Sequence, residues 1–169
     1  MEYNTILALD QAYDKTGFSV YSIEDSEMQH YGLLRLTDIK GDNDKDEKAI
    51  NVIEFIKRAI TYYKIDLVVF EDTQSQKNLN TFKKLNWLQG AIKTYLFENN
   101  IPYSILSPST WRSTLGVKGR DRATQKKNAQ IRVNKLYDIE VTEDEADAIC
   151  IGLASCKLLH KDKLEINKE

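Results

Sequence analysis

Glycine, proline and cysteine are scarce in the 169-residue chain, with 7, 2 and 2 residues respectively. This composition excludes collagen-like, linker-rich and low-complexity chains. Two cysteines cannot build a disulfide scaffold, and we interpret Cys150 and Cys156 as reduced core residues of a cytoplasmic protein. No apolar run approaches the roughly 20 residues of a membrane helix, and the N-terminus carries no signal-type segment. No membrane partner is therefore expected.

The length and composition fit a single globular domain over residues 1–169. The chain is 41% hydrophobic and 30% charged, which argues against disorder. A chain of this length buries roughly 70% of its unfolded surface around one core. Charged residues dominate 161–169, and we expect a flexible tail there.

Charge is strongly segregated along the chain. The net charge of −2 is unfavourable for binding nucleic acid as a whole, but residues 112–135 contain eight basic residues and one acid, Asp121. This window carries +7, which leaves −9 for the remainder. It predicts either a nucleic-acid surface or a solvated helix face.

Hydrophobic periodicity predicts five strands and five helices. The order is three strands, helix, strand, helix, strand and then three helices. Early antiparallel strands followed by βαβ units predict an α/β fold, with a mixed five-stranded sheet and helices on both faces. The expected strands are 4–11, 15–24, 28–36, 66–72 and 102–106, and the expected helices are 46–63, 79–97, 108–115, 122–136 and 143–159.

Four acids occupy positions where a carboxylate is difficult to solvate. Asp10 and Glu71 each follow four apolar residues at the end of a predicted strand. A buried, unpaired charge costs several kcal/mol, so each acid requires a cation or a hydrogen-bond donor. Asp144 and Asp147 lie three residues apart, on one face of the last helix, for which we predict Thr142 as the N-cap.

These acids predict a site for hard divalent cations, because oxygen ligands alone select Mg²⁺ or Mn²⁺. His30 and His160 are too few and too isolated for a zinc site. Carboxylates beside a basic segment are typical of phosphodiester cleavage. Each acid also has a purely structural interpretation, as a turn residue or as a favourable charge at a helix N-terminus.

The pattern resembles the RuvC-type Holliday-junction resolvases of the RNase H-like superfamily, and it is most similar to the phage-encoded branch. The resemblance covers residues 4–155. It depends on the stretches 7–10 (LALD), 16–20 (TGFSV), 68–71 (VVFE), 78–85 (NLNTFKKL), 89–91 (QGA) and 144–148 (DEADA).

This resemblance implies a structure-selective endodeoxyribonuclease. Asp10, Glu71, Asp144 and Asp147 would be the catalytic acids that coordinate two Mg²⁺ ions, for which Mn²⁺ can substitute. A homodimer would cut four-way and other branched DNA by two-metal hydrolysis, in recombination and repair. For a phage-encoded protein, the expected location is the cytoplasm of a bacterial host.

The resemblance also indicates DNA contacts. Arg112 and either Lys126 or Lys127 fall where the family places phosphate-contacting lysines. Family members carry an aromatic residue three positions after the second acid, where this chain has Gln74. The difference favours a broader range of branched substrates. The candidate DNA-binding residues are Gln74, Lys77, Arg112, Lys118, Arg120, Arg122, Lys126 and Lys127.

Other functions remain open at this point. They are a catalytically silent junction-binding protein, an RNase H-like nuclease on RNA–DNA hybrids, and an actin-like ATPase or sugar kinase, which would need two such domains. The helix at 79–97 carries aromatic residues around much of its circumference, so it forms either a dimer interface or a layer between the sheet and another helix. These residues are Phe82, Trp87, Tyr95 and Phe97. Trp111 is predicted to lie in the core.

Overall fold

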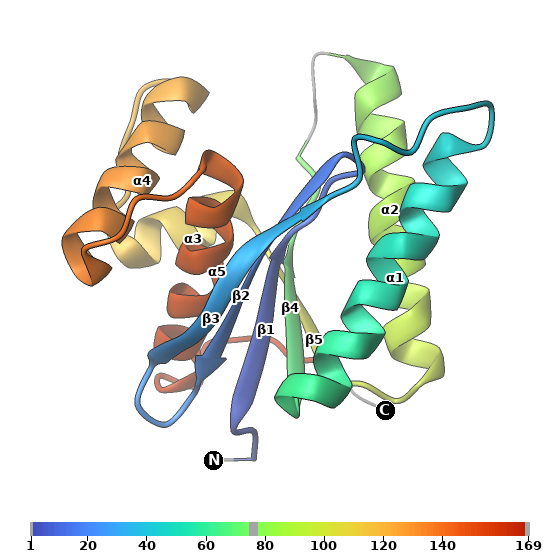
Figure 1. Ribbon diagram of the computed structural model, residues 1–169. Helices are drawn as coiled ribbons and strands as arrows, with labels where there is room; N and C mark the ends of the chain where they lie inside the picture. The colour runs from blue at the N-terminus through green and yellow to red at the C-terminus, as the bar shows by residue number, and fades with distance from the viewer. Residues whose placement is uncertain (1, 75–77, 168–169) are drawn as a thin grey trace.

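The computed structural model describes residues 2–74 and 78–167, and its helices and strands follow the order that the sequence predicts (Figure 1). All bounds lie within two residues of the predicted ones. The elements are β1 (Thr5–Asp10), β2 (Lys15–Ser22), β3 (Glu27–Arg35), α1 (Asp44–Tyr63), β4 (Leu67–Glu71), α2 (Leu79–Glu98), β5 (Tyr103–Leu106), α3 (Pro108–Leu115), α4 (Arg122–Tyr137) and α5 (Glu143–Leu159).

The sheet has the strand order β3-β2-β1-β4-β5. The pairs β1–β2 and β2–β3 are antiparallel, whereas β1–β4 and β4–β5 are parallel. Helices α1 and α2 cover one face, and α3, α4 and α5 lie on the other (Figure 1). The mixed sheet with helices on both faces is therefore confirmed.

The central strand β1 is buried on both faces because two separate cores contact it. Ile6 and Ala8 belong to the core under α5, whereas Leu7 and Leu9 belong to the core under α1 and α2. All four side chains are fully buried. Asp10, which follows these apolar residues, therefore lies where the central strand ends.

Helix α5 packs unusually close to β2. The Ser19 hydroxyl donates a hydrogen bond to the carbonyl oxygen of Ala148 at 2.7 Å. Gly17 permits this approach, because a Cβ at that position would collide with the carbonyl oxygen of Asp144. The start of α5 is therefore positioned by direct contact with the sheet backbone.

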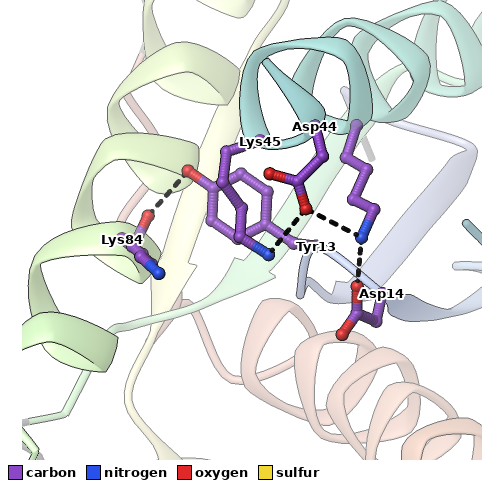
Figure 2. A network of polar contacts seen from close by, with 6 residues as sticks. Tyr13, Asp14, Asp44, Lys45 and Lys84 are labelled. Atoms are coloured by element: carbon purple, nitrogen blue, oxygen red, sulfur yellow. Dashed lines mark hydrogen bonds and ion pairs between the residues drawn. The ribbon is translucent and has the colours of Figure 1, made fainter. Parts of the chain in front are cut away.

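The connection between β1 and β2 is fastened to both helices of the opposite layer. Figure 2 shows the Tyr13 hydroxyl, which donates to the carbonyl oxygen of Lys84 in α2 at 2.9 Å. The buried Lys48 of α1 bridges Asp14, at 2.6 Å, and Asp44, at 3.4 Å. The hydrogen bond from Lys48 lowers the pKa of Asp14 below its usual value. The segment that follows Asp10 is thus held in place.

Several local predictions have clear outcomes. Cys150 and Cys156 are free thiols in the core, as expected. In α2, Leu79 is 61% exposed, and the buried part of the helix begins at Leu88. The expected flexible tail makes a contact that the sequence did not indicate, because Asn167 pairs with Tyr103 in an antiparallel bridge. Among the described residues, no helix is both long and apolar enough to cross a membrane.

Candidate active site

Asp10, Glu71, Asp144 and Asp147 all line one cleft of about 590 Å³. It lies at the edge of the sheet where β1 and β4 end and where α5 begins. The fold therefore brings together the four acids that the sequence singles out, although they come from three separate segments of the chain.

Asp10 and Glu71 are neighbours because they end adjacent parallel strands. The last paired residues of β1 and β4 are Leu9 and Phe70, one position before the acids. The Gln11 side chain extends the pairing beyond the strands. Its Nε2 donates to the carbonyl oxygen of Glu71 at 2.6 Å, and its Oε1 accepts from the Glu71 N–H at 3.2 Å. The main chain at the second acid is therefore fixed at two points.

A capping box fixes the start of α5. The Glu145 N–H donates to the Thr142 hydroxyl at 3.3 Å, and the Thr142 N–H donates to Glu145 Oε2 at 2.9 Å. This confirms the predicted N-cap. Asp147 is only 4% exposed, and its Oδ1 is buried without a hydrogen-bond partner among the described residues.

Helix α3 contributes a contact that the sequence analysis did not identify. Trp111 is fully buried, as predicted, but its Nε1–H also donates to Glu71 Oε1 at 2.8 Å. The Arg112 guanidinium lies over the indole, 4.9 Å from the ring centroid. Ser107 caps the helix, and Pro108 follows at its first position. No local sequence pattern predicts the contact between Trp111 and Glu71, because 40 residues separate them along the chain.

The acids perturb one another's ionisation. Burial, together with the charge of Glu71, raises the pKa of Asp147 to about 7. Burial also raises the pKa of Asp10 well above its usual range, and Glu71 and Asp147 add to this effect. Burial raises the pKa of Glu71, although the hydrogen bond from Trp111 and the charge of Arg112 oppose the change. Positive charge placed in this cleft would therefore stabilise the ionised forms of the acids.

One lysine partly supplies that positive charge. Lys126 Nζ lies 3.2 Å from Glu143 and 3.7 Å from Asp144. Burial lowers the pKa of Lys126, but the carboxylates, first among them Asp147, outweigh this and leave the pKa above its usual value. Lys126 is therefore charged at neutral pH and held at the acids.

The structure brings only some of the candidate DNA-binding residues to the cleft. Gln74, Arg112, Arg122 and Lys126 line it. The other candidates are distributed as follows: Lys118 lines an adjoining hollow together with Gln74 and Arg112, Lys127 lines a separate groove beside Lys135, Arg120 is exposed and lines neither, and Lys77 lies outside the described residues.

The donor set fits hard divalent cations. Within residues 2–74 and 78–167, no three His, Cys, Asp or Glu side chains are already close enough to hold one ion together. The unpartnered Oδ1 of Asp147 is the kind of buried oxygen that a cation would satisfy. His160, by contrast, pairs with the carbonyl oxygen of Ile23, as expected for a structural histidine.

The sheet order and the acidic cleft at the strand ends define an α/β protein of the RNase H-like type. The chain belongs to the family of the crossover junction endodeoxyribonuclease RuvC, which residues 6–155 match. Nucleases of this family depend on divalent metal ions.

Known relatives agree with this assignment. The crossover junction endodeoxyribonuclease RuvC of Protochlamydia amoebophila (strain UWE25) is 27% identical over 158 residues, covering 90% of each chain. RuvC of T. thermophilus, solved in complex with Holliday junction substrate, superposes with a TM-score of 0.78 at 13% identity, over 98% of this chain and 100% of that one. The yeast mitochondrial Holliday junction resolvase gives a TM-score of 0.59 at 18% identity, over 94% and 81%. The two structural likenesses show a shared fold.

We expect the Asp147→Asn variant to be more stable than the wild type in the absence of metal. The pKa of Asp147 rises from 3.8 to about 7 on folding, so the folded state loses stability as the pH rises through this range. At about 1.4 kcal/mol per pKa unit, the gain at pH 8 is on the order of 2–4 kcal/mol, and it is smaller at pH 5. Thermal unfolding in EDTA at both pH values measures it.

The matched control is Glu140→Gln, which neutralises an exposed acid in the connection between α4 and α5. It should change the melting temperature little. Equal stabilities of Asp147→Asn and the wild type at pH 8 would contradict the burial of this carboxylate.

Proposed function

We propose that this chain is a Holliday-junction resolvase, a structure-selective endonuclease that hydrolyses four-way and other branched DNA. The observation that carries the proposal is the single cleft in which Asp10, Glu71, Asp144 and Asp147 meet beside basic side chains. The family match and the relative solved with Holliday junction substrate support it.

In this proposal the four acids hold two Mg²⁺ ions, and Mn²⁺ can replace them. Bound there, the ions would supply an activated water and charge neutralisation for the scissile phosphate. The protein supplies the carboxylate ligands on two strand ends and one helix start, so that few side-chain torsions separate each ligand from rigid backbone. Preorganised ligands of this kind lower the cost of assembling the site.

Basic side chains at the cleft would hold the DNA backbone. Arg112 Nε is buried without a hydrogen-bond partner among the described residues, which suits a group that binds an anion. Arg122 and Lys126 also line the cleft. Gln74 is exposed at its rim, where its amide can bond to bases or sugars but cannot stack as an aromatic ring would. This supports a broad range of branched substrates.

A homodimer suits a four-way junction, because both have two-fold symmetry and each protomer can then present one site. Helix α2 exposes Leu79 (61%), Trp87 (68%) and Phe97 (57%). The exposure of these side chains argues against the alternative in which the helix is sandwiched all round. It favours α2 as part of the dimer interface.

The Asp144→Asn variant should lose cleavage of a synthetic four-way junction while it still binds that junction. Loss of one carboxylate weakens metal binding but leaves Arg112 and Arg122 in place. Cleavage is followed on denaturing gels with Mg²⁺ or Mn²⁺ against an EDTA control, and binding is followed by mobility shift. Lost binding with intact cleavage would contradict the assignment.

The wild-type reaction distinguishes the alternatives. Paired nicks in strands of like polarity indicate a dimeric resolvase, whereas a shifted band without nicks indicates a silent junction-binding protein. If the protein cuts the RNA strand of an RNA–DNA hybrid but leaves the four-way junction uncut, it has an RNase H activity instead.

The Arg112→Ala variant should bind junction DNA with a weaker salt dependence. Each lost phosphate contact lowers the slope of log affinity against log salt by roughly 0.9 on duplex DNA. Lys57→Ala is the matched control, because Lys57 is exposed on α1, across the sheet from the basic helix α4. Equal slopes for wild type and Arg112→Ala would show that Arg112 does not contact the DNA. The same measurement on Lys127→Ala tests whether the separate groove binds DNA.

The Trp87→Glu variant should shift the protein from dimer to monomer, because it places a charge among the exposed apolar side chains of α2. Sedimentation velocity at micromolar concentration measures the change. Tyr62→Glu on α1, where Tyr62 is 78% exposed, is the matched control. An unchanged sedimentation coefficient for Trp87→Glu would show that the dimer interface does not include this part of α2.

A further inference from the structure

We propose that Trp111 is a positioning residue for Glu71, whose carboxylate it holds by one oxygen so that the carboxylate is set in place to bind a divalent cation. The inference rests on the proposed function, because it takes Glu71 as a metal ligand. It concerns a contact between α3 and β4 that neither the strand pairing nor the four acids themselves require.

The hydrogen bond is partly buried, and its donor lies in the core. Trp111 Nε1–H donates to Glu71 Oε1 at 2.8 Å, and the indole is fully removed from solvent. An indole has a single donor and no acceptor. A buried indole whose N–H meets a carboxylate therefore contributes one directed bond to a charged group, and such bonds are roughly twice as strong as neutral ones.

The indole itself cannot turn away. Its backbone N–H bonds to the carbonyl oxygen of Ser107 at 3.2 Å, within the capped first turn of α3. Its ring is embedded in the core under α5, and Arg112 covers the ring at 4.9 Å. A rigid donor of this kind holds its acceptor in one direction.

The two ends of the Glu71 residue are fixed independently. The Gln11 amide binds the main-chain N–H and carbonyl of Glu71, and Trp111 binds the carboxylate. The glutamate side chain between them has three rotatable bonds. Without the indole N–H, only the main-chain end stays fixed, and the carboxylate must be ordered when the metal binds.

The Trp111→Phe variant tests the proposal, because it removes the N–H but keeps an aromatic ring beneath Arg112. We expect Mn²⁺, titrated alone and followed by calorimetry, to bind about tenfold more weakly, as is typical when a group that orients a metal ligand is lost. Junction binding in EDTA should not change. Leu115→Val, at a buried position on the same helix, is the control for lost packing and should leave Mn²⁺ affinity unchanged.

A second measurement uses the unmodified protein, so it does not depend on how the variant folds. The chain has two tryptophans, which give two indole N–H signals in a ¹⁵N-correlated spectrum, and Trp87→Phe assigns them. Mg²⁺ should shift the Trp111 signal with the same dissociation constant that calorimetry gives for Mg²⁺. The signal of the exposed Trp87 should stay in place.

Two results would overturn the proposal. One is Mn²⁺ affinity in folded Trp111→Phe within twofold of the wild type. The other is a Trp111 signal that does not respond to Mg²⁺ when calorimetry shows that Mg²⁺ binds. Failure of the wild type to bind either ion would refute the proposed metal site, and the role of Trp111 with it.

Discussion

The burial of several carboxylates in one cleft, where the central strands end, is the constraint on which the rest of this structure depends. Burial raises the pKa values of Asp10, Glu71 and Asp147, and the charges of neighbouring carboxylates add to the rise at Asp10 and Asp147, so holding these acids ionised in one cleft costs stability. The two cores on either side of β1 must offset this cost. The acids remain together because the strands and the helix that carry them cannot separate without exposing those cores.

The same constraint explains how the surrounding side chains are used. Lys126 is drawn to the acids of α5, and the Trp111 N–H meets the carboxylate of Glu71. Each reduces the cost of one negative charge, but neither removes the need for a cation. Asp147 Oδ1 still has no partner among the described residues. Under the proposed function, this unsatisfied oxygen is the one that a divalent cation would bind.

Much of the fold and the positions of the four acids could be predicted from the sequence, because both follow from local patterns. Apolar strands that end in an acid, and the capping box at Thr142, are visible within a few residues. The contacts of Glu71 with Gln11 and Trp111 could not be predicted, because they join elements 60 and 40 residues apart. Lys126 and Lys127 were indistinguishable for another reason. Neighbours on a helix differ by about 100° in direction, and only packing on α5 decides that Lys126 faces the cleft.

The geometry of the site depends on the backbone more than on the identity of most side chains. Gly17 lets the main chain of β2 touch that of α5 at Asp144, and strand pairing sets the spacing of Asp10 and Glu71. Such contacts require a small residue or an apolar one, which many sequences can supply. This accounts for a TM-score of 0.78 at only 13% identity with the T. thermophilus protein. Gln74, exposed at the rim of the cleft, takes no part in these backbone contacts, so under the proposed function a substitution there would alter DNA contacts without disturbing the positions of the acids.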